Sequence, residues 1–294
     1  MNRHARVLAL ALTATLALIL PAAGHAATAK KPQYYVNLGD SYAVGYQPGK
    51  GSTKNGFADQ TVKKAKKKGY KLELVNFGCG GATTVSIIGA KGCRDEARAL
   101  NGPEYKSTQA DAAAKFIKKN RANVALITIS ISGNDVTKCA RAGAGDPVAC
   151  VAAAIEDIED NLSKLNKQIR KAAGPKVRIV GTTYPDVILG EWVRPNGNQD
   201  LAKLSTTAFK ALINPALQKQ YEAVDGKFVD VTEATGAYTP LEELTNLPPY
   251  GDIPTAVAKV CELTYYCEKG DIHSKTAGYA VIADLIVGTL PKKK

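Results

Sequence analysis

Four short loops of the chain carry residue types that perform nucleophilic chemistry. The first is Gly-Asp-Ser at residues 39–41, which directly follows an apolar run expected to form a strand. A serine at a strand-to-helix turn exposes its Oγ, and backbone N–H groups at a helix start can face an anion. Ser41 is therefore a candidate nucleophile, although helix caps also favour Ser and Asp. The spacing differs from the Gly-x-Ser-x-Gly turn of α/β-hydrolases, which disfavours that fold.

The second and third loops could supply hydrogen-bond donors. Gly-Cys-Gly-Gly at 78–81 follows the second expected strand, and glycines there allow close approach to free backbone N–H groups. Asn134 follows the third expected strand, and its side-chain amide could donate to a developing oxyanion. Both loops could equally be ordinary turns, where Gly, Asn and Asp are favoured. The glycines do not have the Gly-x-Gly-x-x-Gly spacing of dinucleotide-binding proteins.

The fourth loop, Gly-Asp-Ile-His at 270–273, supplies a candidate general base. The chain has three histidines, and two of them, His4 and His25, lie in an N-terminal segment that we expect to be removed. His273 is then the imidazole left to a serine hydrolase, although a lone histidine also serves as a surface or packing residue. So few histidines disfavour a His-rich metal site, and we expect no metal.

The first 26 residues have the pattern of a secretory signal peptide. Arg3 and Arg6 precede an apolar run at 7–20, which is short for a membrane span, and small residues lead to Ala26. An uncleaved anchor is the alternative. We expect cleavage after Ala26, export of the product, and a single domain over 27–294 without a stable membrane insertion.

The cysteines fit an exported protein. There are 6 of them, all after residue 26, and an even number in an exported chain indicates disulfides. Six cysteines allow 15 pairings, and sequence alone does not choose among them. They fall into three local couples, so the spacing favours the pairs Cys79–Cys93, Cys139–Cys150 and Cys261–Cys267. Zinc is disfavoured because no C-x₂-C pair occurs.

Strands and helices alternate along the chain. Apolar runs predict strands at 34–38, 71–77, 124–130, 176–182 and 227–231. Patterned segments between them predict helices at 57–68, 110–119, 151–169, 201–224 and 276–290. We expect Pro215 to break or kink its helix and residues 235–255 to form a long surface loop. The alternation predicts a mainly parallel sheet with helices on both faces, and ligands bind such sheets beyond the carboxyl ends of the strands.

Taken in order, the four loops resemble the sequence blocks of the SGNH (GDSL-type) esterase and lipase family. Gly-Asp-Ser with Gly45 resembles the first block, Gly81 the second, Gly-Asn-Asp at 133–135 the third, and His273 the fourth. The match spans most of the expected mature chain. The three cysteine couples are similar to those of secreted actinobacterial members. The resemblance implies the family's flavodoxin-like, three-layer α/β/α fold with a mainly parallel five-stranded sheet.

The resemblance also implies a mechanism. Ser41 would attack an ester carbonyl, and His273 would take its proton and deliver it to the leaving alcohol. The oxyanion would be held by the backbone N–H groups of Ser41 and Gly81 and by the side-chain amide of Asn134. Water would then hydrolyse the acyl-enzyme, and no metal or organic cofactor is required.

One position departs from the family pattern. The family usually places an Asp three residues before the His, where this chain has Gly270, and Asp271 lies two residues before His273. Either Asp271 or a backbone carbonyl could orient the imidazole, because the third member of such a triad acts by orientation. We interpret Asp40 and Asp135 as structural acids that hold turns through hydrogen bonds.

Rival functions remain open from the sequence. A lipase needs an apolar trough, which Tyr42, Tyr46, Tyr184 and Val187 could line. An acetylesterase that acts on glycans would not need such a trough. The acyl chain length and the role of residues 186–255 stay open. We expect a small-molecule or lipid ester as substrate, and a monomer.

The positive charge suggests a third possibility: a protein with the same fold that binds anionic surfaces and has no catalytic activity. The formal net charge is +12, but it is dispersed in runs such as the lysines at 63–68, which a solvated helix face explains more simply. No pattern of a nucleic-acid-binding module is present, so we expect no nucleic-acid partner.

Overall fold

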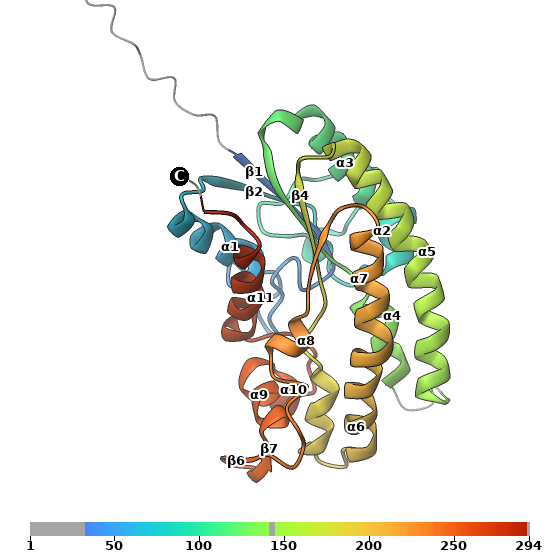
Figure 1. Cartoon of the computed structure of the whole chain (residues 1–294), viewed down its shortest axis with the longest axis vertical. Helices are drawn as coiled ribbons and strands as arrows, with labels where there is room; N and C mark the ends of the chain where they lie inside the picture. Colours follow the sequence, from blue (N-terminus) through green and yellow to red (C-terminus); the bar gives the residue numbers. More distant parts are fainter. Residues whose placement is uncertain (1–32, 141–144, 293–294) are drawn as a thin grey trace, which may run out of the picture. The chain divides into compact units, whose positions relative to one another are not determined.

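The computed structural model describes residues 33–140 and 145–292. The expected signal peptide, residues 1–26, lies outside the described residues. Five parallel strands form one sheet in the order β2-β1-β3-β4-β5 (Figure 1). The strands are β1 (Gln33–Gly39), β2 (Leu72–Asn76), β3 (Val124–Ser130), β4 (Arg178–Thr182) and β5 (Lys227–Val229). The predicted mainly parallel five-stranded sheet is thus confirmed.

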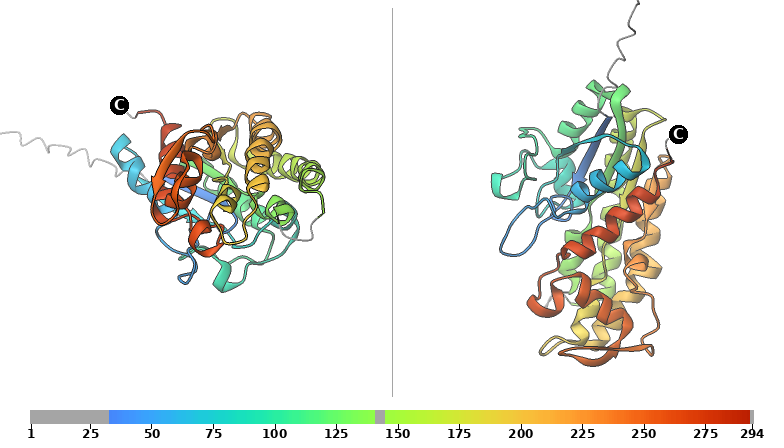
Figure 2. Two further views of the ribbon diagram at one scale, coloured as in Figure 1. Left: turned by 90° about the horizontal axis from the view of Figure 1, so that it is seen from below. Right: turned by 90° about the vertical axis from the view of Figure 1, so that its left-hand side faces the viewer.

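Helices cover both faces of the sheet (Figure 1 and Figure 2). One face carries α1 (Phe57–Ala65) and α11 (Thr276–Gly288). The other face carries α2 (Thr84–Gly89), α3 (Gln109–Lys119), α5 (Pro147–Ala173) and α7 (Asn214–Glu222). Successive strand residues point to opposite faces, so Tyr35 joins the first core and Val36 the second. This three-layer arrangement confirms the predicted fold class.

Short elements lie beyond and between these layers. They are the 3₁₀ segments η1 (Lys66–Lys68), η2 (Asp95–Ala97), η3 (Arg121–Asn123), η4 (Lys138–Ala140) and η5 (Val187–Trp192), and the helices α4 (Gly133–Thr137), α6 (Gln199–Ala208), α8 (Val231–Ala234), α9 (Thr255–Leu263) and α10 (Tyr266–Lys269). A separate small core joins α9 to η5 through residues such as Leu189 and Val257.

The expectation of a long surface loop over 235–255 is wrong. This region contains an antiparallel hairpin of β6 (Leu244–Leu247) and β7 (Gly251–Pro254), and α9 follows directly. Each hairpin strand has only four residues, and the Pro- and Thr-rich composition hides such short strands. Ile253 is buried in the small core, so the hairpin is anchored rather than solvated on all sides.

Near Pro215 the helical backbone is not broken but contains a π turn. Helix α6 ends at Ala208, a π-helical turn (Phe209–Ile213) follows, and α7 begins at Asn214. Proline lacks an N–H, and its ring would clash with the carbonyl four residues earlier in a regular helix. A widened π turn directly before the proline accommodates both effects.

The lysine run has partners on the neighbouring helix. Lys64 Nζ lies 2.6 Å from Asp284 Oδ2, and Lys68 Nζ donates to the carbonyls of Val287 and Leu290 at the end of α11. Part of the charge in this run is thus used to hold α11 to α1.

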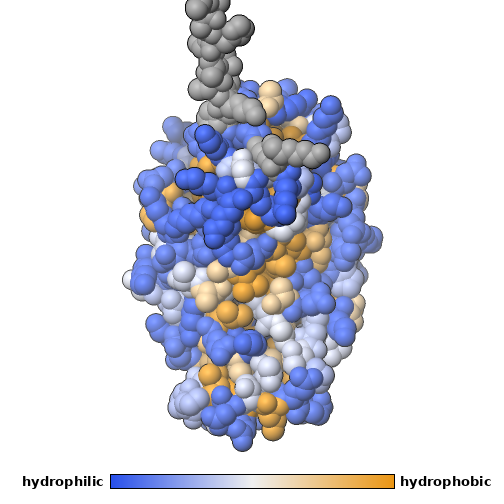
Figure 3. All heavy atoms as spheres, turned by 60° about the vertical axis from the view of Figure 1, so that its left-hand side comes forward, coloured by the Kyte–Doolittle hydropathy of each residue, from blue (hydrophilic) through white to orange (hydrophobic). Residues whose placement is uncertain are grey.

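In Figure 3, where the left-hand side of Figure 1 comes forward, hydrophobic residues lie in the middle of the face among hydrophilic ones.

We expect Gly181→Ala to destabilise the fold. A Cβ on Gly181 of β4 would overlap the ring of Tyr221, which is fully buried on α7. Overpacking of this kind costs about 1–3 kcal/mol of the free energy of unfolding. Gly89→Ala is the matched control, because nothing lies within 4 Å of its added Cβ and alanine favours a helix. Urea unfolding of both variants would refute the packing argument if their midpoints fell equally.

Candidate active site

The nucleophile turn begins where β1 touches β3. Gly39 has φ +140°, and a Cβ there would overlap the carbonyl oxygen of Ser130. Without a side chain at Gly39 the two strand ends meet, and the Asp40 N–H donates to the Ser130 carbonyl at 3.1 Å. Ser41 therefore lies at the carboxyl end of β1. Residues 41–45 form turns, and the next helix begins only at Phe57, so the expected helix start beside Ser41 is wrong.

A histidine from the other end of the chain meets this serine. His273, in the loop before α11, has its Nε2 2.7 Å from Ser41 Oγ. Its Nδ1 lies 2.7 Å from Asp271 Oδ1, and the same oxygen accepts the His273 backbone N–H at 3.0 Å. The carboxylate of Asp271 thus occupies the position that the sequence left open between an acid and a backbone carbonyl.

The charge on Asp271 is favoured by this contact. Burial alone would raise the pKa of the Asp271 carboxyl, but the hydrogen bonds from the ring and backbone of His273 outweigh it and hold the pKa below its ordinary value. A carboxylate at Nδ1 keeps the proton on that nitrogen and leaves Nε2 free to accept one from Ser41. The arrangement is that of a nucleophile with a base and an orienting acid.

The second and third loops are bonded to each other. Asn134, on α4 directly after β3, donates its side-chain amide to the Ala82 carbonyl at 2.9 Å. Asp135 accepts the backbone N–H and the hydroxyl of Thr84. Asn134 lines the same pocket as Ser41. Gly81, with φ +81°, lines a second pocket together with residues such as Tyr105 and Gln109.

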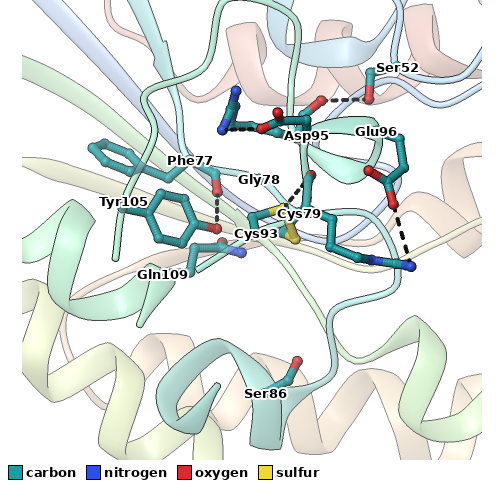
Figure 4. The surroundings of a disulfide bond; sticks show 12 residues. Ser52, Phe77, Gly78, Cys79, Ser86, Cys93, Asp95, Glu96, Tyr105 and Gln109 are labelled. Atoms are coloured by element: carbon teal, nitrogen blue, oxygen red, sulfur yellow. Dashed lines mark hydrogen bonds and ion pairs between the residues drawn. A yellow bond between two sulfur atoms is a disulfide. The ribbon is translucent and has the colours of Figure 1, made fainter. Parts of the chain in front are cut away.

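The loop that carries Gly81 also carries Cys79, whose disulfide bond is drawn in Figure 4. The Cys79 N–H donates to the Gly39 carbonyl at 3.0 Å, and Cys79 is bonded to Cys93. Gln109 binds both the N–H and the carbonyl of Gly39. The other two disulfides are Cys139–Cys150 and Cys261–Cys267, so all three pairs are those favoured by the spacing.

Asp40 is a buried acid next to the nucleophile. Its Oδ1 accepts the Tyr42 N–H at 2.9 Å, and its Oδ2 accepts the Tyr184 hydroxyl at 2.6 Å. Burial raises the pKa of Asp40 to about 6, although both hydrogen bonds and the nearby His273 lower it. The turn hydrogen bond agrees with a structural role for Asp40. Its contact with Tyr184 had no signal in the sequence.

An apolar pocket opens beside Ser41. It holds about 850 Å³ of empty space, its open mouth included. Three of the expected lining residues line the pocket, namely Tyr42, Tyr184 and Val187. The fourth, Tyr46, packs instead against the His273 ring, with the two ring centroids 4.4 Å apart. Most other lining residues are aliphatic or aromatic: Val136, Val148, Val151, Ile188, Leu201, Leu204, Ala208, Phe209, Ile213 and Ile272.

These pocket residues come from α4, the start of α5, η5, α6 with the π turn that follows it, and the loop before α11. Region 186–255, whose role the sequence left open, thus supplies one wall. Among residues 33–140 and 145–292 no group of three His, Cys, Asp or Glu side chains is placed to hold a metal ion. No helix in the same ranges is both long and apolar enough to cross a membrane.

Several solved structures are similar to the chain. An extracellular lipase from Streptomyces rimosus is 17% identical over 86% of this chain and 99% of that one, with a TM-score of 0.48. A phospholipase A1 from Streptomyces albidoflavus NA297 is 17% identical over the same shares, with a TM-score of 0.45. An acetylxylan esterase from Geobacillus stearothermophilus is 14% identical over 87% and 93%, with a TM-score of 0.46.

No curated protein sequence matches the chain significantly. The model of the GDSL-like lipase/acylhydrolase family matches residues 38–281. This range runs from the end of β1 into α11 and includes both Ser41 and His273. The chain therefore belongs to the GDSL-like lipase/acylhydrolase family and is a carboxylic ester hydrolase.

Proposed function

We propose that the protein is a secreted serine esterase of the lipase type, which cleaves esters of extended acyl chains. Ser41 is the nucleophile, His273 the general base and Asp271 the acid that orients the imidazole. The observation that carries the proposal is the 2.7 Å contact between Ser41 Oγ and His273 Nε2 at the wall of an apolar pocket. The three disulfides and the signal-like N-terminus support an exported protein.

In the proposed reaction, Ser41 Oγ attacks the ester carbonyl while its proton moves to His273 Nε2. The carbonyl oxygen becomes an oxyanion, for which the donors are the backbone N–H groups of Ser41 and Gly81 and the amide of Asn134. A side-chain amide has two N–H donors, and only one is needed for the bond to Ala82. The second is left for the oxyanion.

Collapse of this intermediate breaks the bond to the leaving alcohol, which takes the proton from His273. Water then attacks the acyl-enzyme while His273 accepts the water's proton. The bond between the acyl carbon and Ser41 Oγ breaks, Oγ takes the proton back from His273, and the carboxylic acid leaves. The ionised Asp271 stabilises the imidazolium in both steps.

The pocket favours an extended acyl chain over an acetyl group. An acetyl group would contact few of the apolar side chains that line this pocket, whereas each further methylene that is buried there contributes about 0.8 kcal/mol to binding. Neither glycan acetyl esters nor a purely binding function explains why the wall beside Ser41 is built from Val, Leu, Ile and Phe side chains. Acyl chain length is therefore the property that separates the two esterase hypotheses.

Substitutions in the triad test the proposed chemistry. Ser41→Ala and His273→Ala remove the nucleophile and the base, and we expect kcat for p-nitrophenyl butyrate to fall about 10⁶-fold. Asp271→Asn should cost about 10⁴-fold, because an amide cannot hold the correct imidazole tautomer. Ser107→Ala, at an exposed serine, is the matched control and should stay within about twofold. A Ser41→Ala enzyme as active as wild type would contradict the assignment.

Labelling by an organophosphonate separates a hydrolase from a binding protein. The probe should attach to Ser41 in the wild-type protein and fail in Ser41→Ala, because attack needs the serine oxygen and its base. Mass spectrometry of the labelled peptide reads out the site. An unlabelled wild-type protein would favour the non-catalytic alternative.

Asn134→Ala tests the amide donor. The loss of one oxyanion donor typically lowers kcat about 10²–10³-fold. We expect a fall of this size with little change in KM, since the bond forms only when the carbonyl oxygen becomes charged. Steady-state kinetics would exclude Asn134 as a donor if kcat stayed unchanged.

A narrowed pocket tests the acyl site. Ala208→Trp adds bulk to a residue that lines the pocket, whereas Thr207→Trp adds the same bulk to an exposed residue of the same helix. On a series of p-nitrophenyl esters, wild type should prefer longer acyl chains. Ala208→Trp should lose activity on long chains and keep it on acetate, and Thr207→Trp should retain the wild-type profile. A wild-type preference for acetate would instead support the acetylesterase alternative.

A further inference from the structure

Tyr184 links three neighbouring loops at the carboxyl edge of the sheet. It follows β4, Gly133 follows β3, and Asp40 follows β1, and these strands are adjacent in the order β1-β3-β4. The hydroxyl of Tyr184 donates to Asp40 Oδ2 at 2.6 Å, so it crosses the loop after β3 to reach the loop after β1. Tyr184 thereby touches the turns on both sides of the reacting centre.

The ring of Tyr184 packs on the first residue of α4. A Cβ on Gly133 would lie 3.0 Å from the ring carbon Cζ, so the ring rests against the backbone directly before Asn134. The ring also meets the Tyr42 ring edge to face, with centroids 5.0 Å apart. A movement of Tyr184 would therefore shift the backbone on which Asn134 depends.

The hydroxyl end acts on the nucleophile turn. Asp40 uses its second oxygen to accept the Tyr42 N–H, which belongs to the residue after Ser41. The bonds from Tyr184 and Tyr42 to Asp40 fix the backbone on both sides of Ser41. Burial raises the pKa of Tyr184 well above its ordinary value, and the negative Asp40 raises it further, so the hydroxyl remains a donor.

Tyr184 is itself held in place. Its carbonyl accepts the Thr232 hydroxyl from α8 at 2.8 Å, and the following Pro185 restricts its backbone to an extended conformation. The side chain is 7% exposed. A buried ring with a fixed backbone and a short hydrogen bond at its tip has little freedom to change its position.

We propose that Tyr184 is a positioning residue that holds the Ser41 turn and Asn134 at a fixed separation. It acts from one side through the hydrogen bond to Asp40 and from the other through its packing on Gly133. The inference rests on the proposed function, because the separation matters only if Ser41 and Asn134 serve one oxyanion. Misplacement of reacting groups by about 1 Å can cost 10²-fold in rate.

Tyr184→Phe removes the hydroxyl and keeps the ring. Because the Ser41 turn loses the bond that sets its place relative to Asn134, we expect kcat for p-nitrophenyl butyrate to fall roughly 10- to 100-fold. KM should change less than about twofold, because the ring that lines the pocket is retained. Tyr35→Phe is the matched control: it removes an equally buried hydroxyl, which bonds Thr128 Oγ1 at 2.7 Å within the sheet, and should leave kcat within about twofold.

A double-mutant cycle with Asn134→Ala separates positioning from loss of stability. If Tyr184 acts by placing Asn134 against Ser41, Tyr184→Phe should lower kcat clearly less in the Asn134→Ala background than in wild type. Multiplicative effects, or an unchanged kcat in Tyr184→Phe, would overturn the inference. An inactive wild type would instead overturn the proposed function, so the two failures are distinguishable.

A second variant approaches the same contact from α4. Gly133→Ala places a methyl group against the Tyr184 ring and should also lower kcat without a matching rise in KM. Thermal melts of all variants ensure that kinetics are measured on folded protein. If Tyr184→Phe does not fold, an unchanged kcat in Gly133→Ala overturns the inference by itself.

Discussion

The site depends on the close approach of β1 and β3 at Gly39. With no Cβ at this position, the ends of the two strands touch, and the Asp40 N–H reaches the Ser130 carbonyl. Gln109 of α3 and Cys79 of the loop after β2 bind the backbone N–H and carbonyl groups of Gly39, so both segments are fixed to the same residue. Because three loops are built from this one contact, Ser41 and Asn134 meet in one pocket although 93 residues separate them.

The histidine loop reaches this centre by a different route. Helix α11 packs along α1, and this places residues 270–273 over the nucleophile turn. The Tyr42 hydroxyl donates to the Ile272 carbonyl at 2.6 Å, so the residue after Ser41 also holds the residue before His273. Tyr42 thereby contributes to the sheet side of the site and to the histidine side at once.

The sequence predicted what depends on local pattern. Strands with continuous apolar runs, the loops that follow them, and the order of Ser41, Asn134 and His273 all leave a local signal. The sequence left the role of Asp271 open between two alternatives, because its position is shifted by one residue from the family pattern and only the folded loop shows where its carboxylate lies. For the pocket the sequence suggested Tyr42, Tyr184 and Val187 but not the rest of the wall, because that wall combines side chains from α4, α5, η5 and α6, which no single window of sequence contains.

The charges around His273 follow from the same geometry. In the proposed reaction His273 carries a proton between attack and departure. Asp271 contacts its ring directly, and His273 in turn lowers the pKa of the nearby Asp40. A buried carboxylate near a developing oxyanion would be unfavourable if its charge were unscreened. Both oxygens of Asp40 accept a hydrogen bond, from Tyr42 and from Tyr184, and these donors reduce its field on the reacting oxygen. Tyr184, which we propose holds the two loops at a fixed separation, thus also weakens the field of the buried Asp40 carboxylate in the site.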